Sequence, residues 1–411
     1  MEVRMRYDCI VIGGGASGMV AAIFAARRGQ RIAIIEHRER LGKKILATGN
    51  GKCNYTNQVQ TPDCYRGTHP EFAMAVLRQF DVEQTIAFFQ SLGIYPKVRN
   101  GYVYPNSEQA SAVADVLAME LKKLKVEVFL KEHVLSIEKE EHGFLIRTEE
   151  KKEYRGDRVI IATGGLAAPK QGSDGSGLKI LRKLGHTIVE PFPALVQLKA
   201  EGKFFKQISG VRIDAKGELF SGTKKVTEEI GEFLFTDYGI SGIPVFQISR
   251  YAVASVNQGK NTQLLLDFFP HLSENELQNL WYERIKCGGY KTIVELFTGL
   301  LNNKLSSTLL ALAKINPDSS AKKLSKQENS NLISLLKRFP ITITGSNGFE
   351  NAQISAGGVS TEEVNPETME SKLVKGLYLT GEVLDIDGTC GGYNLQWAWT
   401  TGAVAGQHIG K

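Results

Sequence analysis

Three glycines near the start of the chain have a spacing that suits the binding of a dinucleotide. Gly13, Gly15 and Gly18 follow a short apolar run and precede a predicted helix, and the next apolar run ends at Glu36. Glycine lets a backbone approach a ligand closely, and the N–H groups of a helix N-terminus attract phosphate oxygens. A carboxylate at the position of Glu36 would accept hydrogen bonds from the ribose hydroxyls of adenosine. The contacts expected in this unit are Gly13, Gly14, Gly15, Ala16, Ser17, Gly18, Glu36 and His37.

A second group of glycines and polar residues follows shortly after Glu36. The segment Gly42–Asn54 reads GKKILATGNGKCN and combines lysines with glycines, hydroxyls and amides. Such a connection can bring cations and backbone N–H groups to a pyrophosphate or to the edge of a flavin ring. A surface loop with solvated lysines explains the composition equally well. The ligand contacts expected here are Lys43, Lys44, Thr48, Gly49, Gly51, Lys52, Cys53 and Asn54.

Three later segments could return to the same ligand. A predicted strand begins at Val134, another ends in the turn Thr163-Gly164-Gly165, and a third ends at Gly381. The segment from Asp385 onward opens the last helix, whose N-terminus would stabilise negative charge on a ligand. Its aspartates could equally cap the helix, while Asn394 and Gln396 could bind ring oxygens. The expected contacts are Val134, Thr163, Gly164, Gly165, Gly381, Glu382, Asp387, Gly391, Gly392, Tyr393, Asn394, Leu395 and Gln396.

The elements that must position these residues form an α/β pattern. Continuous apolar runs at Tyr7–Ile12, Arg31–Glu36 and Arg158–Ala162 predict parallel strands buried on both faces, and Met19–Arg28 predicts the helix between the first two. A hairpin is predicted around Asn100-Gly101. The last helix is predicted over Tyr393–Gln407. Residues 194–345 carry no phosphate-type glycine loop, so they predict a mixed α+β insert between a dinucleotide-binding domain's two parts, residues 1–193 and 346–411.

The composition excludes several other classes of protein. The net charge of +6 is spread among acidic residues over 411 positions, which argues against a nucleic-acid surface. The five cysteines show no paired spacing, so no zinc site and no redox dithiol is expected. No signal-peptide or membrane-spanning pattern is present, and a cytoplasmic protein with reduced thiols and no membrane partner is predicted. The sequence carries no feature that predicts an oligomeric state.

Long motifs along nearly the whole chain resemble one family of bacterial flavoproteins. They are GKKILATGNGKCNYTN at Gly42–Asn57, GSDGSG at Gly172–Gly177, PFPALVQL at Pro191–Leu198, FLFTDYGISG at Phe233–Gly242, ISAGGV at Ile354–Val359 and GEVLDIDGTCGGYNLQWAWTTGAVAG at Gly381–Gly406. The family is described as aminoacetone-oxidase-like, or BaiN-like, NAD(P)/FAD-dependent oxidoreductases. The resemblance implies a glutathione-reductase-type FAD-binding Rossmann-like domain interrupted by an insert. Its pattern often has Arg at Lys52, His at Asp237 and Thr at Cys390.

The resemblance implies FAD as cofactor, and it leaves the reaction open among several hypotheses. The first is hydride transfer between NAD(P)H, bound transiently, and a small organic substrate held under the insert. Rivals are an oxygen-using amine oxidase, an FAD-dependent RNA-modifying enzyme and a flavin-binding module without catalysis. Candidate proton donors are Tyr393, Tyr104 and Cys53, with Tyr102 and Tyr238 as further tyrosines near the substrate. Packing inside the protein explains each of these side chains at least as well.

Overall fold

A seven-stranded sheet forms the centre of the unit that contains both ends of the chain. The computed structural model describes residues 6–410, and this first unit comprises residues up to 193 and from 353 onward. The strand order is β7 (Glu127–Leu130), β2 (Ile32–Glu36), β1 (Arg6–Ile12), β10 (Glu153–Ile161), β9 (Gly143–Thr148) and β8 (Val134–Glu140), with β19 (Leu377–Leu379) beside β10.

The predicted parallel strands are confirmed by the pairing. Strand β1 pairs in parallel with both β2 and β10, and Ile12 lies opposite Ile35 on one side and Ile161 on the other. The turns that follow these strands therefore leave the sheet at the same edge. Strand β10 begins at Glu153 rather than at Arg158, because its first half pairs antiparallel with β9. That half carries no continuous apolar run, so the sequence pattern did not reveal it.

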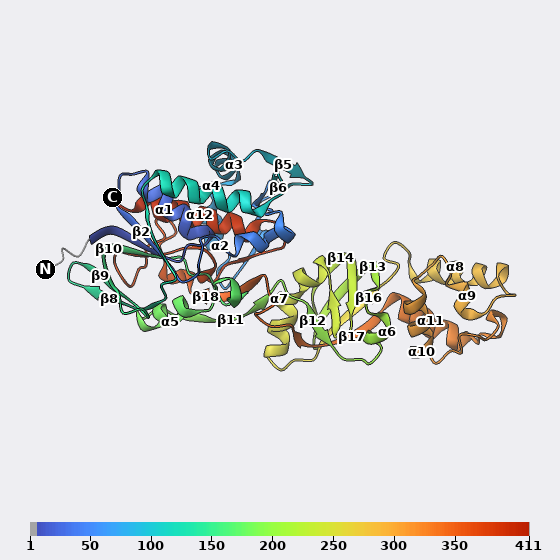
Figure 1. Ribbon diagram of the computed structural model, residues 1–411. Helices are drawn as coiled ribbons and strands as arrows, with labels where there is room; N and C mark the ends of the chain where they lie inside the picture. The colour runs from blue at the N-terminus through green and yellow to red at the C-terminus, as the bar shows by residue number, and fades with distance from the viewer. Residues whose placement is uncertain (1–5, 411) are drawn as a thin grey trace. The chain divides into compact units, whose positions relative to one another are not determined.

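Two helices from opposite ends of the chain pack closely on this sheet. They are α1 (Ala16–Ala26) and α12 (Tyr393–His408), and Figure 1 shows them together with α4 (Ala110–Lys123) along one side of the sheet. A Cβ atom added at Gly402 would lie 2.4 Å from the carbonyl oxygen of Ser17, and one at Gly406 would lie 2.4 Å from that of Ala21. The two glycines therefore allow the close approach of α12 to α1.

Smaller elements surround the edge at which the strands end. Helices α2 (Glu71–Leu77) and α3 (Val82–Ser91) pack against α12. A small sheet contains β3 (Thr56–Asn57) and the predicted hairpin, whose strands are β5 (Pro96–Arg99) and β6 (Tyr102–Pro105). The remaining elements are the short pair β4 (Tyr65–Arg66) and β20 (Asp387–Gly388), the helix α5 (Ser176–Lys183), and the pair β11 (Ile188–Ala194) and β18 (Ile354–Val359).

The second unit, Ala194–Ala352, is built on a closed barrel. The barrel strands are β12 (Leu198–Ala200), β15 (Gly239–Ser241), β14 (Lys224–Thr236), β13 (Arg212–Ser221), β16 (Thr262–Asp267) and β17 (Phe339–Ser346). Helix α7 (Ile243–Asn257) packs on β14 and β17. The other helices of the unit are α6 (Phe205–Ile208), α8 (Glu274–Cys287), α9 (Ile293–Leu296), α10 (Asn303–Leu312) and α11 (Lys326–Lys337). The unit extends past residue 345 because β17, which completes the barrel, runs to Ser346.

Residues 6–410 contain neither a membrane-spanning helix nor a metal-binding cluster. None of the helices in this part of the chain has the length and apolar character needed to cross a membrane. Within the same residues, no cluster of three or more His, Cys, Asp or Glu side chains is arranged to hold a metal ion. The chemistry of the site is therefore sought in the glycine turns and polar side chains of the first unit.

Candidate functional site

The three fingerprint glycines have three different roles in the turn between β1 and α1. A Cβ atom at Gly13 would lie 2.5 Å from the carbonyl oxygen of Ala162, and one at Gly18 would lie 2.0 Å from that of Gly13. Both glycines therefore allow close packing inside the protein. A Cβ atom at Gly15 would have no heavy atom within 4 Å. The open space beside Gly15 lies at the N-terminus of α1, where a pyrophosphate is stabilised by backbone N–H groups and the helix dipole.

The carboxylate of Glu36 is buried at the end of β2 and is held by the backbone. It accepts a hydrogen bond of 2.7 Å from the N–H of Gly14 and one of 2.8 Å from the N–H of Arg38. The first of these bonds links the carboxylate directly to the glycine turn. A carboxylate retains further lone pairs after two such bonds, so Glu36 can still accept from ribose hydroxyls.

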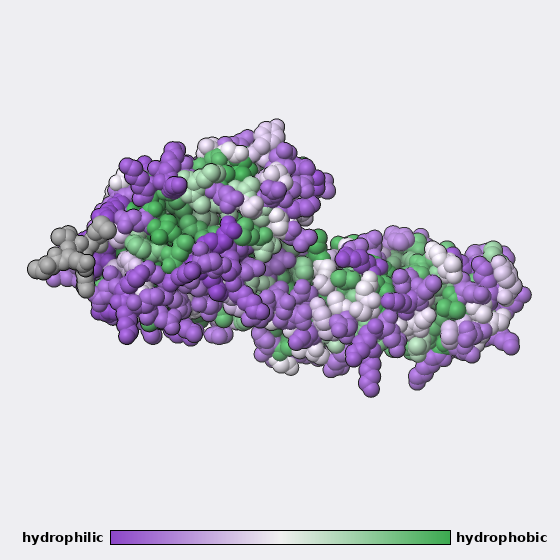
Figure 2. Space-filling view, in the orientation of Figure 1, coloured by the Kyte–Doolittle hydropathy of each residue, from purple (hydrophilic) through white to green (hydrophobic). Residues whose placement is uncertain are grey.

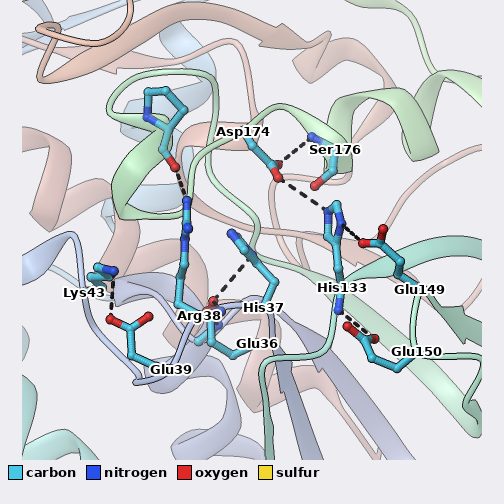
Figure 3. A network of polar contacts seen from close by, with 12 residues as sticks. Glu36, His37, Arg38, Glu39, Lys43, His133, Glu149, Glu150, Asp174 and Ser176 are labelled. Carbon is cyan, nitrogen blue, oxygen red and sulfur yellow. Dashed lines mark hydrogen bonds and ion pairs between the residues drawn. The ribbon is translucent and has the colours of Figure 1, made fainter.

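Polar residues from three segments surround Glu36, as Figure 3 shows. The His37 and His133 rings lie with their centroids 5.4 Å apart. The Nε2 atom of His133 lies 3.4 Å from a carboxylate oxygen of Asp174. The Arg38 guanidinium donates to the carbonyl of Pro169 and so ties the loop before Asp174 to the segment after β2. Burial lowers the pKa of His37 despite the nearby carboxylates, so its ring is neutral and can both donate and accept.

The Thr163-Gly164-Gly165 turn is fixed by a serine that sequence reasoning missed. The hydroxyl oxygen of Ser355 accepts hydrogen bonds from the N–H groups of Leu166 (2.7 Å) and Ala167 (3.2 Å). The same hydroxyl donates to Glu382 at 3.0 Å, and the Ser355 N–H donates to the same carboxylate at 2.9 Å. The turn after β10 is therefore connected to the C-terminal segment through the buried Ser355. The ISAGGV motif, which contains Ser355, was the sequence signal that could have identified this residue.

The second loop, Gly42–Asn54, brings Lys44 to this point. The Lys44 ammonium lies 2.8 Å from the Glu382 carboxylate, whereas the Lys43 ammonium pairs with Glu39 on the protein surface at the same distance. Farther along the loop, Asn50 and Cys53 have φ of 54° and 56°, a left-handed conformation that is unfavourable for residues with a side chain. Strain of this kind is found at ligand-binding turns, and it supports a binding role for the loop.

The start of α12 lies against the same loop and the hairpin. A Cβ atom at Gly392 would lie 2.8 Å from the Thr56 carbonyl oxygen and 3.0 Å from the Asn54 side-chain oxygen. A Cβ atom at Gly391 would lie 3.0 Å from the Tyr102 ring. The two glycines thus permit close contact between the start of α12 and its neighbours, the hairpin and the segment Gly42–Asn54. We call this segment the predicted flavin loop. No side chain of the described residues caps this helix, so its N-terminal N–H groups are suited to a ligand.

Three of the candidate tyrosines, Tyr102, Tyr104 and Tyr393, line this region. Tyr104 is half-buried, and a Cβ atom at Gly49 would lie 3.8 Å from its ring. Burial raises the pKa of Tyr104 and also that of Tyr393. Both phenols are therefore protonated at neutral pH and can serve as proton donors.

The side chains of two predicted contacts, Gln396 and Asn394, are hydrogen-bonded within the protein. Gln396 is fully buried, and its amide binds the hydroxyls of Thr56, Thr85 and Thr400, so it packs α12 in place and does not face a ligand. The Asn394 amide is bonded to both backbone groups of Gly388.

The Cys53 thiol is fully buried, and burial raises its pKa to about 12. The thiol is therefore protonated at neutral pH, which argues against a role as a nucleophile.

The other predicted contacts also lie in the first unit. The Thr48 hydroxyl donates to the Ile45 carbonyl, and Lys52 pairs with Glu108. Val134 begins β8 and is buried, next to His133 in the network around Glu36. Gly381 approaches the Ser17 hydroxyl, and Asp387 is buried in β20. Asp174 and Arg38 were missed as site residues, although the GSDGSG motif that contains Asp174 was noted as shaping the site.

The residues present fit FAD. The open space at Gly15 and the backbone-held Glu36 suit its pyrophosphate and adenosine ribose. Several buried polar atoms in this region have no hydrogen-bond partner within the described chain, and His37 Nε2 and Thr163 Oγ1 are two of them. Buried polar atoms are normally paired, so two unpaired atoms on the segments after β2 and β10 indicate a missing ligand or ordered water. Glu36, His37, Lys44, Thr163 and the turn at Gly15 would hold the cofactor.

The chain is similar to several known proteins. The family model described as HI0933-like protein Rossmann domain matches residues 7–408. A 3-dehydro-bile acid delta(4,6)-reductase of Clostridium scindens is 46% identical over 97% of this chain and 97% of its own length. A ribosomal RNA dihydrouridine synthase of Escherichia coli is 31% identical over 98% of each chain. A solved 3-ketosteroid-delta4-(5alpha)-dehydrogenase of Rhodococcus jostii has a TM-score of 0.48 at 15% identity, covering 99% of this chain and 97% of that one.

Proposed function

The chain belongs to the HI0933-like Rossmann family and is an FAD-dependent oxidoreductase, and we propose that it reduces a conjugated carbon–carbon double bond in a small cyclic ketone. NAD(P)H is the proposed reductant. The substrate class is taken from the relative that is 46% identical along the whole chain and is named a 3-dehydro-bile acid delta(4,6)-reductase. In such a substrate the double bond is polarised by the ketone, so it accepts a hydride at one carbon and a proton at the next.

The observation that supports the proposal is the grouping of three tyrosine side chains beside the Gly42–Asn54 loop and the start of α12. Tyr102 and Tyr104 come from β6, and Tyr393 comes from the first turn of α12. A Cβ atom built at Gly49 would lie 3.8 Å from the Tyr104 ring, and one built at Gly391 would lie 3.0 Å from the rings of Tyr102 and Tyr393. FAD, when bound there, supplies hydride transfer at its N5 atom. The protein must supply the proton and the surface against which the substrate lies.

Tyr104 is the residue we assign to proton donation at its Oη atom. Its ring lies beside Gly49, and its raised pKa keeps the hydroxyl protonated at neutral pH. Tyr393 is a weaker candidate because its hydroxyl hydrogen-bonds to Cys64 and its side chain is buried. Replacing Tyr104 by Phe keeps the ring and removes only the hydroxyl group, so it tests this role directly.

The first experiment is anaerobic reduction followed by the visible spectrum. Purified protein is mixed with NADH or NADPH, bleaching is recorded, and a 3-oxo steroid acid with conjugated double bonds is then added. Bleaching by the nicotinamide and recovery of colour on addition of the steroid acid support the proposal. Absence of FAD after reconstitution overturns it. Bleaching by aminoacetone alone, with peroxide formed in air, would instead identify an amine oxidase.

RNA is the second candidate substrate, and one specific observation favours it. The ribosomal RNA dihydrouridine synthase of Escherichia coli matches 98% of this chain, although at 31% identity. Uridine reduction also adds a hydride and a proton across a double bond conjugated to a carbonyl, so the same tyrosines and FAD would suffice. Reduction of uridine in a ribosomal RNA transcript, measured by mass spectrometry with no turnover of the steroid acid, would establish this alternative.

A further inference from the structure

Three cations converge on a single carboxylate at the base of the β5–β6 hairpin. The ammonium of Lys97 and the guanidinium of Arg99 each lie 2.6 Å from one oxygen of Glu108, and the Lys52 ammonium lies 3.1 Å from the other. The carboxylate side chain is only 24% exposed, while the three cations are 34–54% exposed. The group therefore carries a net charge of +2 with its cations toward solvent.

The cations lie on the same face of the hairpin as the two tyrosines. Lys97 is paired across the strands with Tyr104, and Arg99 is paired with Tyr102. Side chains of directly paired residues in antiparallel strands point to the same face. Lys52 reaches this face from the predicted flavin loop. Lys97 and Arg99 are thus the direct cross-strand partners of Tyr104 and Tyr102, whose rings lie beside Gly49 and Gly391.

Two features show that this arrangement is held firmly. Glu108 has φ of 51°, a left-handed conformation that costs free energy in a residue other than glycine. Its hydrogen bonds to Lys97 and Lys52 lower its pKa to about 2, so it stays ionised at all ordinary pH values. A surface carboxylate can pair with one cation without a strained backbone. Glu108 has a strained backbone and pairs with three cations. In Figure 2 the region of this hairpin is mostly hydrophilic on the visible side.

We propose that Lys97, Arg99 and Lys52 form an anion subsite that binds the carboxylate of the substrate while its rings lie against Tyr102 and Tyr104. The inference rests on the proposed function, because it takes the acidic cyclic substrate from there and adds where the carboxylate of that substrate binds. A hydrophobic acid has the charge and the apolar body that this face recognises. Glu108 is a positioning residue, which holds the three cations together.

The test compares an acid with its neutral ester. Binding of a 3-oxo-4,6-diene cholanoic acid and of its methyl ester to the holoenzyme is measured by calorimetry and by the visible spectrum of bound FAD. The wild-type protein should bind the acid about tenfold more tightly, because two or three charge contacts of modest strength are lost with the ester. The double variant Lys97→Gln/Arg99→Gln should lose that preference and bind both compounds alike.

Three controls separate the subsite from folding and from the cofactor. Lys97→Arg/Arg99→Lys keeps both charges and should keep the preference, whereas Lys122→Gln removes an exposed lysine of α4 elsewhere and should change nothing. FAD affinity and thermal stability are measured on every variant. Loss of the preference with FAD affinity retained supports the subsite.

The inference is overturned if the wild type binds acid and ester equally or binds no acid, or if the acid preference survives in the Gln variant. Selective loss of RNA binding in that variant, with the acid unaffected, would also overturn it and favour a phosphate ligand. Failure of turnover with both compounds contradicts the proposed function alone, since the binding comparison still decides the subsite.

Discussion

The Lys44 ammonium lies 2.8 Å from the Glu382 carboxylate, although 338 positions separate the two residues in the chain. The other oxygen of Glu382 binds Ser355, which in turn holds the turn after β10. One partly exposed ion pair therefore joins the loop after β2, the turn after β10 and the C-terminal segment. These are three of the segments predicted to contact the cofactor.

Removing the charge of Lys44 should weaken FAD binding. Lys44→Met retains most of the side-chain stem and loses the cation, and a lost charge-assisted contact should raise the FAD dissociation constant about tenfold. The constant is measured by the recovery of flavin fluorescence on dilution, with Lys122→Met as the matched control on an exposed helical site. An unchanged FAD affinity in Lys44→Met would show that the Lys44–Glu382 ion pair connects the protein segments and does not contribute to FAD binding.

Two alanine substitutions in the glycine turn should separate folding from cofactor binding. Gly15→Ala places its methyl group in open space at φ of −80°, so the apoprotein should keep its melting temperature while FAD binding falls at least about tenfold. Gly18→Ala places a methyl group 2.0 Å from the Gly13 carbonyl oxygen and should destabilise the fold itself by about 2 kcal/mol or more. Equal melting temperatures for the two variants would contradict this division.

The stability of the first unit should fall as the pH drops below about 6.5. His186 is buried, with Nδ1 3.0 Å from Glu363 and Nε2 3.0 Å from Ser371. The Ser371 hydroxyl already accepts two backbone N–H groups, from Leu373 and Val374, so it donates to Nε2 and the neutral ring donates to Glu363 from Nδ1. Burial lowers the pKa of His186 below its usual 6.5, so the unfolded chain binds this proton more readily.

The sign follows from that difference in proton binding. The contribution of His186 is fully present above the unfolded pKa and is lost as the pH falls toward the lowered folded pKa. Glu363, whose pKa is also lowered, adds a loss at more acidic pH. Calorimetric melting temperatures between about pH 5 and 8 should show the decline, and His186→Gln should flatten its upper part. A profile that is equally steep in His186→Gln would assign the decline to other groups.

Alkylation should distinguish the cysteines by exposure. Cys287 is exposed and should react first with iodoacetamide at about pH 8, whereas Cys53 is buried with a pKa of about 12 and should remain unmodified in the native protein. Peptide mass spectrometry before and after denaturation measures both sites. Cys53→Ser should retain turnover within about threefold, because the thiol is packed in the protein and contacts no substrate. Rapid native labelling of Cys53 would restore it as a candidate acid.

The amino-acid sequence by itself determined the elements whose pattern is local. The apolar run that became β1, the glycine spacing before α1 and the acid that ends β2 lie within 31 positions, from Arg6 to Glu36, and each follows from burial and backbone geometry. The Asn100-Gly101 turn and the last helix were predicted for the same reason. The motifs of the later glycine-rich segments also predicted the order in which the chain comes back to the first glycine turn.

Only the tertiary structure decided which partners the side chains of those segments meet. Lys43 and Lys44 are adjacent in sequence, yet Lys44 pairs with Glu382 and Lys43 with Glu39, because adjacent side chains leave the backbone in different directions. The Gln396 amide forms hydrogen bonds with three threonines from different elements. Such contacts depend on how the strands are ordered and how closely α12 approaches α1, and those distances are fixed by packing between residues hundreds of positions apart.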